Sequence, residues 1–506
     1  MSALQSIDYV ALAPALVAAL AAVAVLLADL VLPLPRRPAV LWVAVAGAVA
    51  ATAASLALVG QRRSTFCTPP ATLPGGVASG QSCSYVVDGF TLFLLVLMSA
   101  SALGALLVSV AYARDAALPP GEYGFLLLAS LTGGLVLAGG RDLVTLIVGL
   151  ETLTLPTYAL VGLRRRSRAG AEAAVKYLLV SVTATAVMLL GVAFVYGLTG
   201  TVHLGRIGAA LAARPEVRDL PLTAAAVVLV LAGFGFKIAA VPFHWWAPDV
   251  YEGAPVPVAA YLATVSKAGG VAGLLLVSVV AFSELRSVWA PVLAVLAVAS
   301  MTLGNLVALR QRQAVRLLAW SSVAHAGYLL VPLGAAGVGD LSAAVTATLG
   351  YLGFYVAINL GAFACVTAAA RTVPGGLVDG YRGLAGRSPL VAAALAFFLL
   401  GLAGLPPTLA GLVAKVVVVR AALLGGAGWL AVAVALNTVV GLAYYLRLAS
   451  LPFRAPARAV EVTGPGGATT LRPARSVALA IGAAAAVTLV LGVAPQLVLG
   501  SVSLAP

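Results

Sequence analysis

Long apolar runs, separated by short polar segments, follow one another along the whole chain. Each run has at least roughly 17–25 residues, which is the length a helix needs to cross the hydrocarbon core of a bilayer. No soluble domain is left over, so the pattern predicts an all-α polytopic membrane protein. Fourteen helices are predicted, at Tyr9–Leu34, Ala39–Gly60, Val86–Ala113, Tyr123–Gly140, Leu143–Leu163, Ala171–Leu198, Leu222–Ala240, Val256–Phe282, Val288–Leu309, Ala314–Leu333, Leu341–Ala370, Pro389–Leu424, Trp429–Leu448 and Val477–Leu499.

Two of these runs contain a helix breaker next to a lysine. Lys237 precedes Pro242, and Lys415 follows Pro406 and Pro407 in a run that is too long for one straight span. A proline alone is better explained as a kink in a packed helix. The presence of a lysine near the proline in each of the two runs favours discontinuous helices instead. Backbone that leaves the helix at membrane depth is tolerated only where protein or water satisfies its polar groups, and such a hydrated site also suits a lysine.

The two breaks lie five helices apart, which predicts an inverted repeat with one broken helix in each half. The first repeat would comprise helices 4 to 8, and the second would comprise helices 9 to 13. The predicted divisions are 1–120 for helices 1 to 3, 121–283 for the first repeat, 284–450 for the second, and 451–506 for helix 14.

Composition places the chain firmly in the membrane class. It has 62% hydrophobic and 9% charged residues, against roughly 45–50% and about 25% in soluble domains. The net charge of +14 raises the possibility of nucleic-acid binding, but the arginines form short clusters between apolar runs, without a basic stripe. The first apolar run lacks a basic flank and exceeds a signal-peptide core in length, so we expect it to be retained.

The arginines predict the orientation. With the N-terminus outside, 18 of the 26 arginines fall on the inner side and 8 on the outer side. The positive-inside rule therefore predicts both termini on the outer face. This topology places Cys67 and Cys83, in one long polar loop, on the oxidising side, where a disulfide is expected. Cys365 falls within a helix and is interpreted as a packing residue.

The lysines are distributed differently from the arginines. Coding bias explains why arginine outnumbers lysine, but not why all lysines fall inside predicted helices. Arginine cannot release its proton in a protein, whereas a desolvated lysine can titrate near neutrality. Charge at membrane depth is costly, so the pattern indicates proton handling, with snorkelling to the surface as the alternative. That alternative is strongest for the first of the four lysines, which are Lys176, Lys237, Lys267 and Lys415.

A carboxylate and two histidines complete the candidate site. Glu151 lies deep in the fifth helix, is expected to be the most deeply buried carboxylate, and is interpreted as the counter-charge of Lys237. His244 and His325 are candidate proton relays, as is Lys176. For each histidine, an ordinary hydrogen-bonded packing role remains the alternative.

Three segments carry a resemblance to a known family. They are "GLETLTLPTYALVG", "GFGFKIAAVPFHWWAPDVYEGAPVPVAAYLATVSKAGG" and "GLPPTLAGLVAK". The chain resembles the antiporter-like subunits of proton-pumping NADH:quinone oxidoreductase (respiratory complex I), with motifs spread over roughly Tyr123 to Leu448. A lysine at Lys415 suits subunits N and L. The chain stops at Pro506 without the long lateral helix of subunit L, so subunit N is expected.

The resemblance implies roles for individual residues. Glu151 matches the glutamate of helix 5, Lys237 its partner in broken helix 7, Lys267 the connecting lysine of helix 8, and Lys415 the lysine on the exit side. It implies proton translocation coupled to quinone reduction elsewhere in the complex. Neighbours would be subunits of the M, K and J types in a bacterial plasma membrane.

No redox chemistry is expected in this chain. It has no cysteine cluster for iron–sulfur, no convincing dinucleotide fingerprint and no histidine pair for haem. Flavin, iron–sulfur clusters and quinone would belong to partner subunits, and neither cofactor nor metal is expected here. One alternative is a subunit of a multisubunit cation/proton antiporter or membrane-bound hydrogenase. Another is a structural membrane scaffold with inert lysines.

Overall fold

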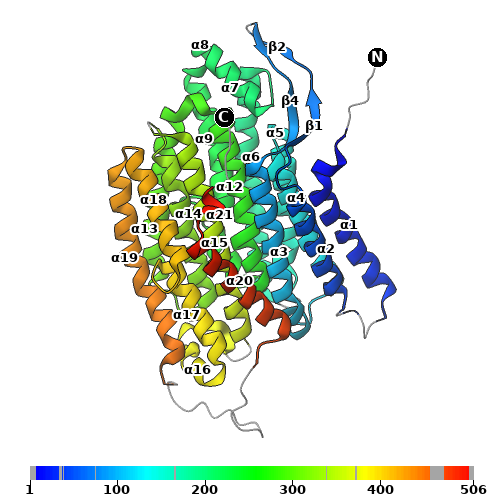
Figure 1. Cartoon of the computed structure of the whole chain (residues 1–506), viewed down its shortest axis with the longest axis vertical. Coiled ribbons are helices and arrows are strands. Elements are labelled where there is room, and N and C mark those ends of the chain that lie inside the picture. Colours follow the sequence, from blue (N-terminus) through cyan, green and yellow to red (C-terminus); the bar gives the residue numbers. More distant parts are fainter. Residues whose placement is uncertain are drawn as a thin grey trace.

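The computed structural model is a bundle of membrane-length helices (Figure 1). It describes residues 7–33, 37, 39–74, 76–164, 167–337, 339–370, 373–455 and 472–500. The helices without a break are α1 (Tyr9–Val31), α2 (Val40–Leu56), α3 (Gly89–Asp115), α4 (Pro120–Gly139), α5 (Leu143–Gly162), α6 (Arg168–Thr199), α13 (Arg286–Ala308), α14 (Ala314–Gly334), α15 (Leu341–Ala369), α19 (Gly428–Ser450) and α20 (Arg475–Val493).

The remaining elements are the pieces of interrupted helices and the short connecting helices and turns. The other helices are α7 (Leu204–Ala213), α8 (Pro215–Arg218), α9 (Pro221–Ile238), α10 (Trp246–Gly253), α11 (Val256–Tyr261), α12 (Lys267–Leu276), α16 (Leu384–Arg387), α17 (Pro389–Ala403), α18 (Leu409–Leu424) and α21 (Gln496–Leu499). Two π-helical turns, Leu262–Ser266 and Val277–Ala281, flank α12. Single 3₁₀ turns are Ser283–Leu285, Pro374–Gly376, Val378–Tyr381 and Leu451–Phe453.

The membrane character predicted from the sequence is confirmed. Each of the fourteen predicted runs is helical, and twelve helical segments of the described chain are long and apolar enough to cross a bilayer. The other two runs are α2 and the pair α17 and α18, which is divided into two short helices. Helices α14 and α15, together with the stretch Val256–Ala281, are almost completely enclosed by their neighbours. They form the centre of the bundle.

Both predicted interruptions are present. Helix α9 ends at Ile238, and the next residue, Ala239, adopts the left-handed conformation with φ of 60°. Helix α17 ends at Ala403, and Gly404 adopts the same conformation with φ of 82°. This conformation terminates a helix, since it cannot continue the ladder of i to i−4 hydrogen bonds. The chain resumes as α10 after the first break and as α18 after the second.

The sequence did not predict the strands. The long polar loop between α2 and α3 folds into two antiparallel pairs, β1 (Arg63–Thr68) with β4 (Ser82–Val87), and β2 (Ala71–Leu73) with β3 (Val77–Ser79). Cys67 lies opposite Cys83 in the first pair, and a disulfide joins them. Figure 1 shows this hairpin at the end of the bundle that also carries α7 and α8.

Two arginines at this end fix the hairpin. The Arg63 guanidinium donates to Asp8 at 2.9 Å and holds the pKa of that carboxyl below its ordinary value. Arg206 of α7 donates to the carbonyl of Pro69 at 2.6 Å and to the hydroxyl of Ser82 at 3.0 Å. Both arginines belong to the face that is predicted to hold only 8 of the 26 arginines. Each of them has a structural partner nearby. The terminal residues 1–6 and 501–506, predicted on the same face, lie outside the described residues.

Candidate functional site

Lys237 occupies the last turn of α9, directly before the first break. It is 3% exposed, and its ammonium donates to the hydroxyl of Thr154 on α5 at 2.5 Å. Helix α12 crosses at this point, where a Cβ on Gly270 would come within 3.0 Å of Lys237 Cγ. Glycine therefore permits the close packing that excludes bulk water from this lysine.

Glu151 lies one turn before Thr154 on α5, but the expectation that it is the most deeply buried carboxylate is wrong. It is half-buried, and among the described carboxylates Asp142 is more deeply buried, at 3% exposed. Asp142 caps the start of α5 by accepting from Thr145 N at 2.8 Å, which explains a buried carboxylate without a catalytic role. Glu151 itself accepts a hydrogen bond from Thr185 of α6 at 2.7 Å.

Glu151 and Lys237 face each other across a small cavity instead of forming a direct ion pair. Both are in the described part of the chain, and their charged groups have separate hydroxyl partners, Thr185 and Thr154. The cavity leaves about 10 Å³ for the centre of a water molecule, which is about the space that one water needs. The carboxylate of Glu151 and the ammonium of Lys237 therefore line the same small cavity, where the negative charge of Glu151 favours the charged form of Lys237.

Lys267 lies at the start of α12, directly after a π-helical turn, and is 1% exposed. Its ammonium donates to the carbonyl of Ile238 at 2.6 Å and to the carbonyl of Ser322 on α14 at 3.0 Å. Ile238 is the last residue of α9, so its carbonyl has lost its helical donor at the break. A cation at a helix C-terminus is favourable, because the carbonyls there carry partial negative charge.

Lys415 makes the corresponding contact at the second break. This half-buried lysine of α18 donates to the carbonyl of Ala403, the last residue of α17, at 2.6 Å. Its ammonium also lies 5.5 Å from the ring centroid of Tyr328, within the range of a cation–π contact. Each break thus presents the terminal carbonyl of its first half-helix to a lysine. At the first break this is Lys267 of the separate helix α12, and at the second it is Lys415 of α18, the second half of the same run.

His325 on α14 lies between these two lysines in a cluster of phenols. Its Nδ1 is 2.7 Å from the hydroxyl of Tyr351, and its Nε2 is 2.9 Å from the hydroxyl of Tyr445. The Tyr445 hydroxyl makes a further short hydrogen bond with Ser321. Both ring nitrogens therefore have hydroxyl partners, each able to donate or accept, which is the arrangement that a proton relay requires.

The other two candidate relays lie elsewhere. The His244 ring is completely buried in the first break, against the rings of Trp245 and Trp320, and its nitrogens make no well-aligned hydrogen bond to a described residue. Lys176 is on the surface of α6 and pairs with Glu172 at 2.7 Å and with Asp249 at 3.1 Å. It is therefore separated from the buried lysines.

A surface network joins Lys176 to the segment after the first break. Asp249 of α10 also accepts from Arg316 of α14 at 2.8 Å, and Arg316 donates to Glu252 at 2.7 Å. The two acidic residues come from the "PDVYEGAP" motif, so the motif anchors α10 to its neighbours. These pairs are solvated, and we assign them a structural role.

Sequence reasoning missed the uncharged members of this site. They are Thr154, Thr185, Ser321, Ser322, Tyr328, Tyr351, Tyr355 and Tyr445. The four tyrosines lie within the apolar helices α14, α15 and α19, where an aromatic residue is also typical of an ordinary core position. Among the described residues, no group of three or more histidine, cysteine, aspartate or glutamate side chains could hold a metal ion.

Comparison with known proteins gives a consistent result. The family model described as "NADH:quinone oxidoreductase/Mrp antiporter, TM" matches residues 140–441. The NADH-quinone oxidoreductase subunit N of Salinispora tropica is 50% identical over 99% of each chain, and subunit N 2 of Streptomyces griseus is 51% identical over 93% of this chain and 87% of that one.

A solved structure agrees with these sequence matches. A chain of respiratory complex I from Thermus thermophilus with bound aureothin is 33% identical, with a TM-score of 0.75 over 96% of this chain and 98% of that one. These matches extend over the helices that hold Glu151, Lys237, Lys267 and Lys415. The chain therefore belongs to the subunit N family of NADH-quinone oxidoreductases, within the wider NADH:quinone oxidoreductase/Mrp antiporter membrane family.

Proposed function

We propose that this chain moves protons along a buried line of groups that runs from Glu151 through Lys237, Lys267 and His325 to Lys415. It does so as the proton-translocating membrane subunit of an NADH:quinone oxidoreductase, a translocase whose redox steps take place in other subunits. The observation that carries the assignment is the pair of lysine contacts at the two breaks. Lys267 and Lys415 each bind the terminal carbonyl of a broken helix.

These contacts stabilise the protonated form of each lysine, and their loss would favour release of the proton. The ammonium is stabilised by the carbonyl end of the half-helix, which no longer has its own donor. A small displacement of the half-helix removes that stabilisation in a site of low dielectric constant. One pKa unit corresponds to about 1.36 kcal/mol, and one charge crossing 100 mV to about 2.3 kcal/mol, so such displacements act on the relevant scale.

The phenol cluster provides the connection between the two halves. Lys267 contacts the backbone of Ser322, whose hydroxyl is 2.9 Å from Tyr355, and the His325 ring is 4.9 Å from the Tyr355 ring. Tyrosine and serine hydroxyls can each accept one proton and donate another. The cluster therefore supports proton transfer between Lys267 and Lys415 with His325 in the middle.

The assembly around this chain follows from the same proposal. The chain is a membrane subunit of a larger complex, and we propose neighbours of the M, K and J types. Flavin, iron–sulfur clusters and quinone belong to the partner subunits that oxidise NADH. We further propose a bacterial plasma membrane, with the hairpin and both chain ends on the outer face. Domain divisions at residues 120, 283 and 450, with the two middle segments as inverted repeats, complete the proposal.

Substitution of Lys237 in the assembled complex tests the proposal. We expect Lys237→Met to abolish proton transfer through this subunit, because methionine fills a similar volume and does not titrate. Lys237→Arg should also impair it, because guanidinium keeps its proton. The measurement is NADH-driven acidification of vesicles that contain the complex, together with the rate of NADH oxidation.

A matched control is available in Lys176, which is exposed and ion-paired. Lys176→Met should leave the ratio of protons moved to NADH oxidised unchanged. If the Lys237→Arg complex pumps at the full ratio, deprotonation of Lys237 is refuted as a step. Isolation of the native chain without any NADH-oxidising subunit would instead favour the cation/proton antiporter alternative.

A further inference from the structure

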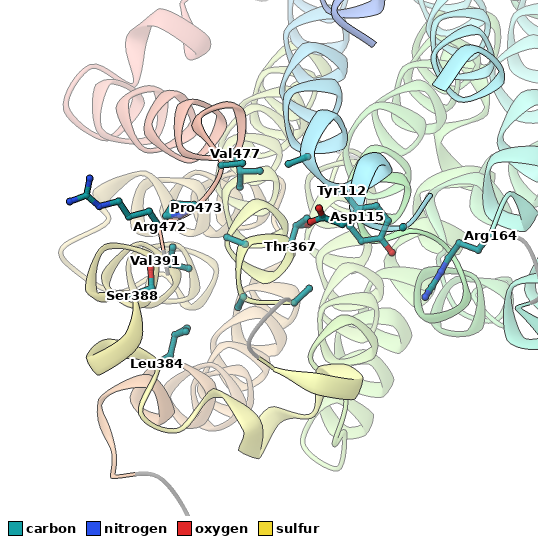
Figure 2. Close-up of a pocket in the computed structure, with 16 residues that line it drawn as sticks. Tyr112, Asp115, Arg164, Thr367, Leu384, Ser388, Val391, Arg472, Pro473 and Val477 are labelled. Atoms are coloured by element: carbon teal, nitrogen blue, oxygen red, sulfur yellow. The ribbon is translucent and has the colours of Figure 1, made fainter. Parts of the chain in front are cut away.

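A cavity of about 330 Å³ opens at the arginine-rich end of the bundle, away from the proton-transfer residues. It lies among the ends of α3, α15, α16, α17 and α20. Figure 2 shows Arg472 and Ser388 toward one end of the cavity, and Arg164 at the opposite end beyond Asp115. Two arginines and one aspartate give its lining a net positive charge.

Two helix N-termini border the end that holds Arg472. Helix α17 begins after Ser388 and helix α20 begins after Ala474, and neither N-cap residue makes a side-chain capping bond. The free amides of the first turns, which begin at Leu390 in α17 because Pro389 has no N–H and at Arg475 in α20, lack intrahelical acceptors and carry partial positive charge. Paired with an arginine, such termini form a binding site for an oxyanion.

Ser388 provides an independent indication that a ligand belongs here. It is 7% exposed and lines the cavity, yet its hydroxyl makes no hydrogen bond with any described residue. A serine at the start of a helix normally accepts from an amide of the first turn. The hydroxyl oxygen is not among the buried side-chain atoms that lack a partner, so it is accessible at the surface of the cavity. Here the hydroxyl is available to a group inside the cavity.

We propose that this cavity binds the phosphate of an anionic phospholipid headgroup. The Ser388 hydroxyl and the amide ends of α17 and α20 would contact the phosphate oxygens. The exposed Arg472 side chain, which extends outward from the cavity in Figure 2, would turn toward the bound phosphate. Helix-end basic pockets on the inner side of membrane proteins are suited to such headgroups. Leu390 and Leu479, near the starts of the same two helices, remain 81% and 60% exposed and offer apolar surface to the acyl chains.

The test is equilibrium binding of spin-labelled phosphatidylglycerol to the purified complex, delipidated in a neutral detergent. Arg472→Gln should weaken binding about tenfold, the effect of one charge-assisted hydrogen bond. Ser388→Asp should weaken it at least as much, because the added carboxylate repels phosphate while aspartate remains a good N-cap and preserves α17. Arg454→Gln, at an exposed arginine outside the cavity lining, should bind like the unmodified complex.

Competitors distinguish the sources of phosphate. Unlabelled phosphatidylglycerol should displace the probe, whereas neutral diacylglycerol should not, and inorganic phosphate should compete only at much higher concentration. Equal potency of inorganic phosphate would overturn the assignment to a lipid. Unchanged binding in both cavity variants, or no binding to the unmodified complex because another subunit fills the cavity, would overturn the site. Proton pumping is not part of the readout, so this result is independent of the proton path.

Discussion

The sequence identified those site residues that place an ionisable side chain inside an apolar run, where a charge is energetically costly. Lys237 and Lys267 are buried, and Lys415 is half-buried, as expected from their position in apolar runs. Lys176 shows the limit of this reasoning. Its position five residues into the predicted helix Ala171–Leu198 allowed either role, and only the surrounding fold supplies the Glu172 and Asp249 partners that keep it at the surface.

The uncharged residues could not be predicted in the same way. Thr183 and Thr185 lie two residues apart on α6, but Thr183 donates to the carbonyl of Leu179 in its own helix, whereas Thr185 donates to Glu151. Threonine in a helix commonly makes the first kind of bond. The second kind depends on how α5 and α6 pack, which is tertiary information that local sequence patterns lack.

Replacement of Glu151 tests whether its charge acts on Lys237 across the small cavity. Glu151→Gln keeps the shape and can still accept from Thr185, but removes the negative charge. We expect a lower ratio of protons moved to NADH oxidised, with the complex still assembled. Glu172→Gln, which removes an exposed carboxylate from the surface network, serves as the control. An unaltered ratio in the Glu151 variant would argue against electrostatic coupling of the two residues.

The phenol cluster yields a prediction at Tyr445. Tyr445→Phe removes the hydroxyl that contacts both His325 Nε2 and Ser321, so transfer through the histidine should slow about tenfold, the cost of one lost hydrogen bond of about 1.4 kcal/mol. The measurement is the proton-to-NADH ratio in vesicles. Tyr381→Phe serves as the control, because Tyr381 is equally buried but is not one of the tyrosines around His325. A relay role is contradicted if the two variants pump equally well.

At the scale of elements, the helix breaks were predictable and the hairpins were not. Proline marks both breaks directly, because Pro242, Pro406 and Pro407 cannot donate to the helical hydrogen-bond ladder. The loop that contains β1 to β4 is rich in serine, threonine, proline and glycine, a composition that also describes irregular loops. Its strands form through pairing with each other and through contacts to Arg206 and Asp8.

The hairpin carries a prediction about the Cys67–Cys83 disulfide. The two residues are direct cross-strand partners in a loop expected on the oxidising face. Peptide mapping by mass spectrometry under non-reducing conditions should recover the two cysteine peptides as one linked species. Cys365, buried within α15, should appear as a free thiol in the same digest. Detection of Cys67 and Cys83 as free thiols in freshly prepared membranes would contradict both the disulfide and the assigned side.

At the scale of the whole molecule, the number and order of spanning segments followed from hydropathy alone. Their three-dimensional arrangement did not, because apolar periodicity says little about which helix lies at the centre. Helices α14 and α15 have no more apolar sequence than α6, yet they are almost fully enclosed, while α6 remains largely exposed to its surroundings. Position in the bundle is set by packing and by the polar contacts of His325 and the tyrosines.

The orientation of the molecule determines the direction in which protons move, and it can be tested with two cysteine substitutions. Ala213, at the end of α7, and Ala117, between α3 and α4, are exposed at sites predicted on opposite faces. Arginines favour the inner side because translocating them is costly. Ala213→Cys should therefore react with a membrane-impermeant maleimide in intact cells, and Ala117→Cys only after permeabilisation. The native cysteines provide a low background, since one is buried and two are bonded. The reverse labelling pattern would invert the topology and, with it, the assignment of the Lys415 half to the exit side.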